Sequence, residues 1–402
     1  MSRKLAIIGA GQAGFAVAAK LRALGSDDEI VLIGEEASPP YQRPPLSKAF
    51  LKGELEEDRL WFRPASFFRD HAIDFRPATR AAGVDRVDRR VILDDGEVPY
   101  DQLVIATGSA PRRLPAEAGG DFPNVHSLRS IEDARHLGRA LKLARTVLIV
   151  GGGYVGLEVA AVAAAYGKQV CLLEASERIL QRVASPETSD YFRAMHRERG
   201  VDIRESTGVA RMEGRDAAER AVLSDGSTLP CDLVLVGIGA MANDGLARAA
   251  GLACDNGIVV DARGRTSDPA IWAAGDVCTF PFKGRRTRLE SVQNAVDQGE
   301  VIAANLMGGD LDYAPVPWFW SDQYDVKLQI VGLTQGYDRA VRREGRTEGS
   351  QSVWYFSGER FLGLEAMNEP RSYMIGRKLL DKGICPPPEA VADAAFDLRG
   401  LL

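Results

Sequence analysis

The sequence predicts an α/β protein made of two similar units, one inserted in the other, followed by a small C-terminal α+β domain. Three repeated features support this prediction: a strand–turn–helix pattern, an acid after the next strand, and a second strand-and-turn segment downstream. The strand-like "KLAIIGAGQAG" at Lys4 recurs as "TVLIVGGGYVG" at Thr146. In both copies a short apolar run passes directly into G-x-G-x-x-G and then into an Ala-rich helical pattern.

Each copy is followed by a second apolar strand that ends in an acid. "EIVLIGEE" supplies Glu35 and "QVCLLEAS" supplies Glu174, each about twenty residues past its glycines. Further on, "DGEVPYDQLVIATGSAPR" from Asp95 is echoed by "DGSTLPCDLVLVGIGAMAN" from Asp225. The sequence therefore predicts two complete Rossmann-like dinucleotide-binding units. The alternative that one of the units is vestigial is disfavoured, because the glycines and the acid are intact in both.

The three glycines of each fingerprint have separate roles. The first makes the tight turn out of the strand, the second lets a pyrophosphate approach the backbone, and the third lets the helix pack closely on the sheet. They are Gly9, Gly11 and Gly14 in the first unit and Gly151, Gly153 and Gly156 in the second. The phosphates are then expected at a helix N-terminus, where free N–H groups and the macrodipole favour anions.

The acid after the second strand indicates which nucleotide fits. The carboxylates of Glu35 and Glu174 can each accept hydrogen bonds from a ribose diol, whereas a 2′-phosphate meets charge repulsion there. If the second unit holds the nicotinamide nucleotide, Glu174 predicts NADH rather than NADPH.

Composition excludes several other classes. The 402-residue chain is 45% hydrophobic with a formal charge of −6, so it lacks the excess of Lys and Arg that a general nucleic-acid or anionic-membrane binder needs. Its five cysteines form no close pair, which disfavours a disulfide scaffold, a zinc ribbon or an iron–sulfur site within the chain and favours a reducing cytoplasm. We assign no metal and no catalytic role to the four histidines, His71, His126, His136 and His196.

The N-terminal stretch has a second possible interpretation. "SRK" followed by "LAIIGAGQAGFAVAA" imitates the charged and apolar regions of a signal peptide. The glycine spacing and the strand pattern that follows favour a folded domain instead.

A third motif follows the second unit and indicates which dinucleotide each unit holds. In "AIWAAGDV" a strand delivers Asp276 at a Gly-containing turn, suited to hydrogen-bonding a ribityl or pyrophosphate group. With this motif the sequence resembles the two-dinucleotide flavoprotein superfamily, which implies FAD on the first unit and NAD(H) on the inserted second. "ATG" at Ala106 and "AGD" at Ala274 match the points where the polypeptide of that superfamily leaves and re-enters the FAD domain. The expected parts are 1–110 and 241–312 for the FAD domain, 111–240 for the NAD domain and 313–402 for a C-terminal domain facing the flavin.

The segment after the first acid carries no cysteine. Disulfide reductases of this superfamily place a redox-active cysteine pair there, whereas this chain has "YQRPPLSKAFL", which excludes a dithiol relay. "RPPLSK" instead places Arg43 and Lys48 beside the expected flavin, with two prolines stiffening the approach. The alternative is that Ser47 caps a helix and Lys48 is solvated.

Four segments together narrow the resemblance. "YQRPPLSKAFL", "GGGYVGLEVAA", "LESVQNAVDQG" and "VPWFWSDQYDVKLQIVG" look like the NADH-dependent ferredoxin reductases of the putidaredoxin reductase type, which serve cytochrome P450s and aromatic-ring dioxygenases. The match runs in order through nearly the whole chain. It implies FAD contacts at Ala13, Glu35, Arg43, Lys48, Ala81, Arg129, Asp276 and Val292, and further cofactor contacts at Thr107, Gly108, Tyr154, Val155, Gly239 and Trp320.

The same resemblance implies the chemistry. Nicotinamide C4 would deliver a hydride to flavin N5, and the electrons would leave singly to an iron–sulfur protein. Lys48 would lie near N5, paired with Glu158, where an ammonium can stabilise negative charge developing on the ring. Glu158 as an ordinary helix-surface acid remains the alternative.

The segment "PVPWFWSDQYDVK" at Pro315 is unusually aromatic. If Trp318, Phe319 and Trp320 run extended, their side chains alternate and both tryptophans share one face. Domain packing is one explanation for this face. The resemblance implies instead that Trp320 lies against the isoalloxazine, away from nicotinamide, and presents an aromatic edge toward a docked ferredoxin.

The sequence thus predicts an FAD-dependent NADH:ferredoxin oxidoreductase whose partner is a [2Fe-2S] ferredoxin, bound transiently and electrostatically. A reductase of rubredoxin, quinone or dioxygen, and a flavoprotein like apoptosis-inducing factor, remain as alternatives. No nucleic-acid or membrane partner is expected, and the oligomeric state is a monomer or weak dimer. A basic patch for the partner could draw on Lys283, Arg285, Arg286, Arg288, Arg339, Arg342, Arg343, Arg371, Arg377 and Lys378, although ordinary solvated charges explain them equally well.

Overall fold

The computed structural model describes residues 2–402, which divide into two compact units. The first comprises the chain up to Gln42 together with Glu56–Ala110 and Ala240–Pro315. The second comprises Arg43–Leu55, Pro111–Gly239 and Val316–Leu402. The predicted α/β class with one unit inserted in the other is confirmed, while the finer division into four parts stays a prediction.

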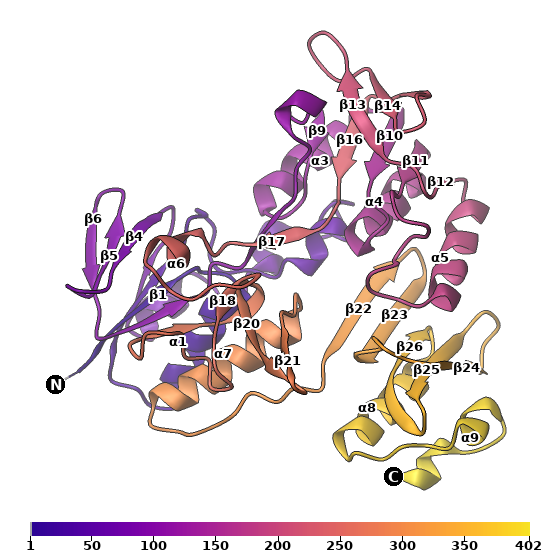
Figure 1. Cartoon of the computed structure of the whole chain (residues 1–402). Helices are drawn as coiled ribbons and strands as arrows, with labels where there is room; N and C mark the ends of the chain where they lie inside the picture. The colour runs from indigo at the N-terminus through magenta and orange to yellow at the C-terminus, as the bar shows by residue number, and fades with distance from the viewer. Residues whose placement is uncertain (1) are drawn as a thin grey trace. The chain divides into compact units, whose positions relative to one another are not determined.

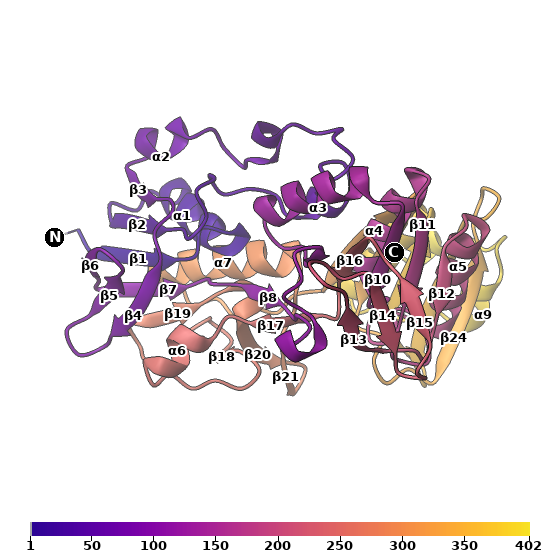
Figure 2. The ribbon, with the colours of Figure 1, turned by 90° about the horizontal axis from the view of Figure 1, so that it is seen from above.

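The first unit is built on a five-stranded parallel sheet in the order β19-β7-β1-β2-β3 (Figure 2). These strands are β19 (Ile271–Ala273), β7 (Gln102–Ile105), β1 (Lys4–Ile8), β2 (Glu29–Ile33) and β3 (Ile73–Arg76). Continuous apolar runs such as "LAII" in β1 are typical of parallel strands that are covered on both faces.

Alternate residues of β1 enter two different cores. Leu5 and Ile7 pack with the helices α1 (Gln12–Ala23) and α7 (Val292–Leu306). Ala6 and Ile8 pack on the opposite face against residues of the antiparallel strands β4 (Ala81–Asp85), β5 (Arg90–Leu93) and β6 (Gly96–Pro99). The first unit is therefore layered as helices, parallel sheet and antiparallel sheet. Its smaller elements are β18 (Ile258–Val259), β20 (Cys278–Phe282), β21 (Arg285–Thr287), α2 (Ser66–Asp70) and α6 (Gly245–Ala249).

The second unit repeats this plan. Its parallel sheet has the order β12-β11-β10-β16-β9, with β12 (Asp202–Arg204), β11 (Gln169–Leu173), β10 (Thr146–Val150), β16 (Leu233–Val236) and β9 (Val125–His126) (Figure 1). One face packs with residues of α3 (Ile131–Leu143), α4 (Tyr154–Ala165) and α5 (Pro186–Glu198). The other face packs on β13 (Val209–Glu213), β14 (Arg220–Leu223) and β15 (Thr228–Pro230). Two short strands, β8 (Ser109–Pro111) and β17 (Ala240–Ala242), pair where the chain passes between the units.

An antiparallel sheet in the order β22-β23-β26-β25-β24 completes the second unit. Its strands are β22 (Trp318–Gln323), β23 (Val326–Gly332), β26 (Arg360–Met367), β25 (Gln351–Ser357) and β24 (Arg339–Glu344). Val353 and Tyr355 of β25 join the core around α4, whereas Trp354 and Phe356 pack on the opposite side with residues of α8 (Pro370–Asp381) and α9 (Pro388–Ala392). This sheet therefore buries both of its faces.

Helix α4 lies between the parallel sheet and the C-terminal sheet. Its residues from Gly156 to Ala163 are all buried, and its sequence "YVGLEVAAVAAA" is apolar on every side apart from one charged residue, Glu158. A helix that is apolar all round belongs inside a protein. A charge in such a helix must be paired, because an isolated buried carboxylate is costly.

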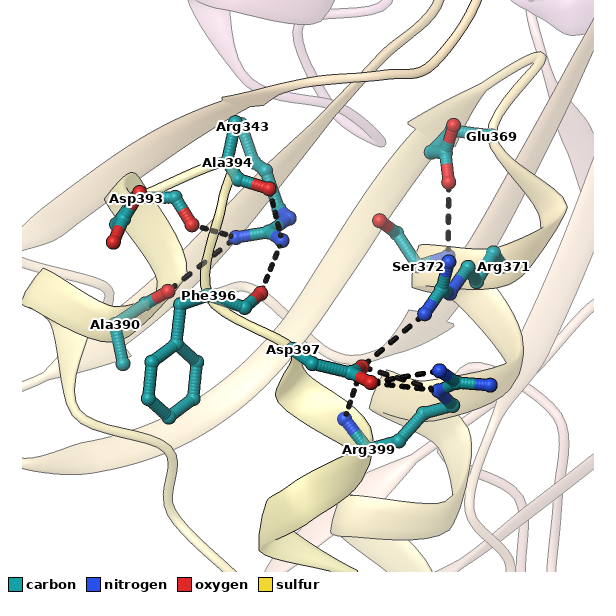
Figure 3. A network of polar contacts seen from close by, with 10 residues as sticks. All are labelled: Arg343, Glu369, Arg371, Ser372, Ala390, Asp393, Ala394, Phe396, Asp397 and Arg399. Atoms are coloured by element: carbon teal, nitrogen blue, oxygen red, sulfur yellow. Dashed lines mark hydrogen bonds and ion pairs between the residues drawn. The ribbon is translucent and has the colours of Figure 1, made fainter.

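The chain end is fastened to the C-terminal sheet by Arg343 of β24 (Figure 3). Its guanidinium donates to the carbonyls of Ala390, Val391, Asp393, Ala394 and Phe396 at 2.6–3.3 Å. Arg371 and Arg399 both reach the carboxylate of Asp397 in the same region. Arg343 is one of the ten basic residues from which a partner patch could draw, and in the structure its donors bind these backbone carbonyls.

No helix between residues 2 and 402 combines the length and the apolar character that a membrane span requires.

Arg343 and its neighbour Arg342 give a matched test of this attachment. Arg343→Gln leaves several carbonyls without their donor and should lower the free energy of unfolding by about 2 kcal/mol. Arg342→Gln removes an exposed residue paired only with Glu344 and should cost less than about 0.5 kcal/mol. Urea denaturation followed by tryptophan fluorescence measures both, and equal losses would contradict the structural role of Arg343.

Candidate dinucleotide sites and a buried ion pair

The first fingerprint has the geometry that its glycines predict. Gly9 has φ +106°, and a Cβ added to it would lie 2.2 Å from the carbonyl oxygen of Ala106. A Cβ on Gly14 would lie 1.9 Å from the carbonyl oxygen of Gly9, so helix α1 can approach the strand only with glycine there. Gly11 has nothing within 4 Å of its Cβ position. The space above Gly11 is open for a pyrophosphate.

The second fingerprint repeats these contacts in the second unit. Gly151 has φ +110°, and its Cβ would lie 2.4 Å from the carbonyl oxygen of Gly237. The Cβ of Gly156 would lie 2.1 Å from the carbonyl oxygen of Gly151, while Gly153 again has nothing within 4 Å. Both units therefore hold an open backbone cradle at a helix N-terminus, which fits one dinucleotide each.

The two acids differ in their surroundings. Glu174 follows β11 directly, and its carboxylate accepts hydrogen bonds from the backbone N–H groups of Gly152 at 2.8 Å and Ser176 at 2.7 Å. The parallel register makes Gly34 the equivalent of Glu174, because Ile33 pairs with Ile8 as Leu173 pairs with Val150. Glu35 therefore lies one position further along. Its side chain is 78% exposed.

Other residues predicted to contact FAD lie in the first unit. Asp276 lies in the 3₁₀ turn η4 (Gly275–Val277) and accepts a hydrogen bond from Ser109 at 3.0 Å. Gly275 has φ +82°, and its Cβ position lies 3.0 Å from Ala13. Val292 begins α7, which packs on α1. Thr107 donates to the carbonyl of Asn243, Gly108 has φ +68°, and Ala81 begins β4.

The second unit contains the other predicted residues, including a buried ion pair. Lys48 Nζ lies 2.7 Å from Glu158 Oε2, and the two side chains are 18% and 4% exposed. The expected contact between these two residues is thus present, and neither is solvated as the alternatives had it. Lys48 also donates to the carbonyl of Pro44 at 3.1 Å, in the 3₁₀ turn η1 (Pro44–Ser47). Arg43, just before this turn, donates to the carbonyl of Arg129 at 2.7 Å.

Two serines complete the surroundings of Glu158. Ser47 donates to Glu158 Oε2, and Ser321 of β22 donates to Oε1 at 2.6 Å. Sequence reasoning considered Ser47 only as a possible helix cap and did not single out Ser321. Ser321 could have been suspected, because strand alternation places it on the face opposite the tryptophans, next to Phe319.

The aromatic run of β22 alternates as predicted. The rings of Trp318 and Trp320 lie 5.6 Å apart on one face, and the Arg377 guanidinium lies 5.6 Å from the Trp318 ring. Phe319 points the other way and contacts Tyr154 with a centroid distance of 4.7 Å. Burial raises the pKa of Tyr154 well above its ordinary value, so this residue is a neutral hydroxyl.

Two further residues predicted to bind a cofactor lie close to the second cradle. Val155 is 40% exposed in the first turn of α4. Gly239 has φ +100°, and the Arg182 guanidinium lies 3.1 Å from its Cβ position. A larger residue at Gly239 would strain the backbone because of its positive φ, and the Arg182 side chain would have to shift slightly.

Comparison with known proteins agrees with this arrangement. The chain matches the pyridine nucleotide-disulphide oxidoreductase family over residues 3–299 and the reductase C-terminal family over residues 318–402. It is 43% identical to rhodocoxin reductase of Rhodococcus erythropolis over 399 residues, 98% of this chain and 93% of that protein. It is 40% identical to the ferredoxin–NAD(+) reductase component of the anthranilate 1,2-dioxygenase system of Burkholderia cepacia over 402 residues, 98% of each chain.

A solved structure shows the same fold over the whole length. The reductase in the covalent putidaredoxin reductase–putidaredoxin complex superimposes with a TM-score of 0.96 at 38% identity, covering 99% of this chain and 98% of that one. The two cradles and the fold define an oxidoreductase that binds FAD and NAD(H). The chain belongs to the ferredoxin reductases of the putidaredoxin reductase type.

Gly153 and Gly156 separate nucleotide binding from folding. Gly153→Ala places a methyl group in open space, so it should leave the unfolding free energy within about 0.5 kcal/mol of wild type and weaken NAD⁺ binding at least about tenfold. Gly156→Ala places a methyl group against a carbonyl oxygen and should destabilise the protein by about 2 kcal/mol. Calorimetric NAD⁺ titration and urea denaturation distinguish the two effects. A Gly153→Ala protein that binds NAD⁺ normally would show that the pyrophosphate lies elsewhere.

Proposed function

We propose that this chain passes electrons from NADH to a [2Fe-2S] ferredoxin that serves a cytochrome P450 or an aromatic-ring oxygenase. The observation that carries the proposal is the buried Lys48–Glu158 pair, which joins the cysteine-free segment Arg43–Leu55 to the fingerprint helix of the second unit. The names of the relatives, which include a reductase component of a dioxygenase system, support the choice of acceptor.

The residues of the first unit would hold FAD. Gly11 offers backbone to its pyrophosphate, and Asp276, which accepts a hydrogen bond from Ser109, offers a carboxylate to the hydroxyl donors of the ribityl chain. In the second unit, Gly153 and Glu174 would hold the pyrophosphate and the adenine ribose of NADH. Bound FAD would supply the redox chemistry, namely two-electron reduction by NADH and one-electron transfer to the iron–sulfur partner.

We further propose that Lys48 presents its ammonium to the flavin ring near N5, and that Glu158 and the carbonyl of Pro44 fix its direction. Both contacts come from the second unit, at 2.7 Å and 3.1 Å. An ammonium held by a carboxylate and a carbonyl loses little freedom when the cofactor accepts charge, which is the requirement for electrostatic stabilisation.

Trp320 is proposed to cover the flavin on the side away from nicotinamide. Trp320 is partly exposed beside the tilted ring of Trp318, and we propose that one edge of it faces a partner. An aromatic cover excludes water and dioxygen without adding a titratable group.

Anaerobic stopped-flow reduction by NADH, followed by steady-state turnover with four acceptors, tests the proposed function. A [2Fe-2S] ferredoxin should turn over faster than rubredoxin, quinone or dioxygen. A faster rate with one of the other three would assign that acceptor instead. Failure of NADH to reduce the bound flavin would overturn the proposal entirely.

We further propose a cytoplasmic location and a monomer or weak dimer.

Nucleotide choice follows from Glu174. kcat/KM for NADH should exceed that for NADPH by at least about tenfold, the factor that corresponds to about 1.4 kcal/mol. Glu174→Ala should narrow the gap mainly by weakening NADH, whereas Glu177→Ala, an exposed acid three residues on, should leave the ratio unchanged. Steady-state kinetics with both nucleotides measures this. Equal kcat/KM values for NADH and NADPH in the wild type would contradict the proposed role of Glu174 in nucleotide choice.

Separable kinetics are expected at Trp320. Trp320→Ala should leave reduction by NADH within a few-fold of wild type, slow electron delivery to ferredoxin, and raise NADH oxidation by dioxygen, because the flavin loses its cover. Trp318→Ala removes the neighbouring ring and serves as the control, with a smaller effect on ferredoxin turnover. A Trp320→Ala enzyme that loses only thermal stability and transfers electrons normally would show that this residue has a packing role alone.

A further inference from the structure

A chain of buried polar side chains continues beyond Ser321. Gln323 Nε2 lies 3.2 Å from Ser321 Oγ, and Gln323 Oε1 lies 2.8 Å from His196 Nε2. His196 Nδ1 in turn lies 3.3 Å from the hydroxyl of Tyr324. Ser321, Gln323 and His196 are each 0% exposed. The chain joins helix α5 and strand β22 to Glu158, entirely within the second unit.

The directions of these hydrogen bonds follow from the ion pair. In its ion pair with Lys48, Glu158 accepts hydrogen bonds, so the single hydroxyl hydrogen of Ser321 points at Glu158. Ser321 Oγ then accepts from the amide NH₂ of Gln323. This orientation leaves Gln323 Oε1 facing His196, which must donate from Nε2.

The last link fixes the tautomer of His196. Since a neutral imidazole carries one proton, a proton on Nε2 leaves Nδ1 as an acceptor for the Tyr324 hydroxyl. Burial lowers the pKa of His196 to about 4, so the ring is neutral at physiological pH. At the outer end, the Arg199 guanidinium lies 4.7 Å from the Tyr324 ring and binds Asp325 at 2.7 Å.

Resting on the proposed function, we propose that Ser321, Gln323 and His196 are positioning residues that aim a hydrogen-bond donor at Glu158 and thereby set how firmly Glu158 holds Lys48. Every donor in the chain points toward the carboxylate. Aligned hydrogen bonds in a low-dielectric interior polarise one another. This row of hydrogen bonds therefore withdraws negative charge density from Glu158. The ammonium of Lys48 is then a stronger positive group toward the flavin.

The sign of the effect on FAD distinguishes this role from simple packing. Glu158→Gln removes a negative charge beside Lys48 and should raise the midpoint potential of bound FAD. Ser321→Ala removes a donor from Glu158, makes the site more negative, and should lower that potential, with hydride transfer from NADH about three- to tenfold slower and the Kd for NAD⁺ unchanged. Gln323→Met should act in the same direction with a smaller effect, since Ser321 loses only its orientation.

Two comparisons control for structural damage. His196→Gln keeps a donor toward Gln323 and an acceptor toward Tyr324, so it should preserve the wild-type potential, whereas His196→Leu should lower it as Gln323→Met does. Ser352→Ala removes a buried hydroxyl of the same sheet that contacts Trp354 rather than Glu158, and it should leave the potential unchanged. Potentiometric dye titration of each FAD-loaded variant measures these shifts.

A second measurement does not depend on electron transfer. In ¹⁵N-histidine NMR of the wild-type protein, with or without FAD, His196 should be neutral between pH 5 and 8 and carry its proton on Nε2. A proton on Nδ1 would reverse the chain and overturn the proposal, as would equal potentials in Ser321→Ala and Ser352→Ala. If neither Lys48→Met nor Glu158→Gln changes the potential, the proposed place of Lys48 at the flavin fails, while the NMR result still decides the direction of the chain.

Discussion

The packing of the second unit depends on the ion pair and hydrogen bonds that neutralise one buried carboxylate. Glu158 lies in a helix that is otherwise apolar on every side and is enclosed by two sheets. Removing one partner of a buried ion pair costs several kcal/mol, so the donors around Glu158 stabilise the fold. They come from two separate parts of the chain, the turn after Arg43 and the first strand of the C-terminal sheet, both distant in sequence from the helix that carries Glu158. The ion pair therefore ties together segments that are distant in sequence.

The two units show how a repeated fold acquires different chemistry. Their fingerprint glycines make equivalent contacts, and the distances from the added Cβ positions to the nearest carbonyl oxygens agree within a few tenths of an ångström. The differences are confined to side chains on this common frame. The position two residues after the third glycine is Ala16 in the first unit and Glu158 in the second, and the position after the second strand is Gly34 in the first and Glu174 in the second. Only the second unit thus buries an acid behind its nucleotide cradle.

Strand β22 serves two purposes because its side chains alternate. One face carries Trp318 and Trp320, which remain partly exposed, and the other carries Phe319, Ser321 and Gln323 toward the helices. A single extended segment can thus offer an aromatic surface on one side while its other side supplies hydrogen bonds to Glu158 and His196. Packing on both faces of the C-terminal sheet holds this strand in place.

The sequence by itself determined the nested α/β plan, the two cradles, the alternation of Trp318 and Trp320, and the pairing of Lys48 with Glu158, because the glycine spacing, the strand period and the family motifs are local patterns. Tertiary structure alone decided which side chains meet Glu158. Nothing in the local sequence around Ser47 and Ser321 marks them as partners of Glu158, and Arg343 has the local sequence of a surface cation. The strand register makes Gly34, rather than Glu35, the equivalent of Glu174. These outcomes depend on contacts between residues far apart in the chain, where burial and hydrogen-bond geometry, rather than any local pattern, determine the partner.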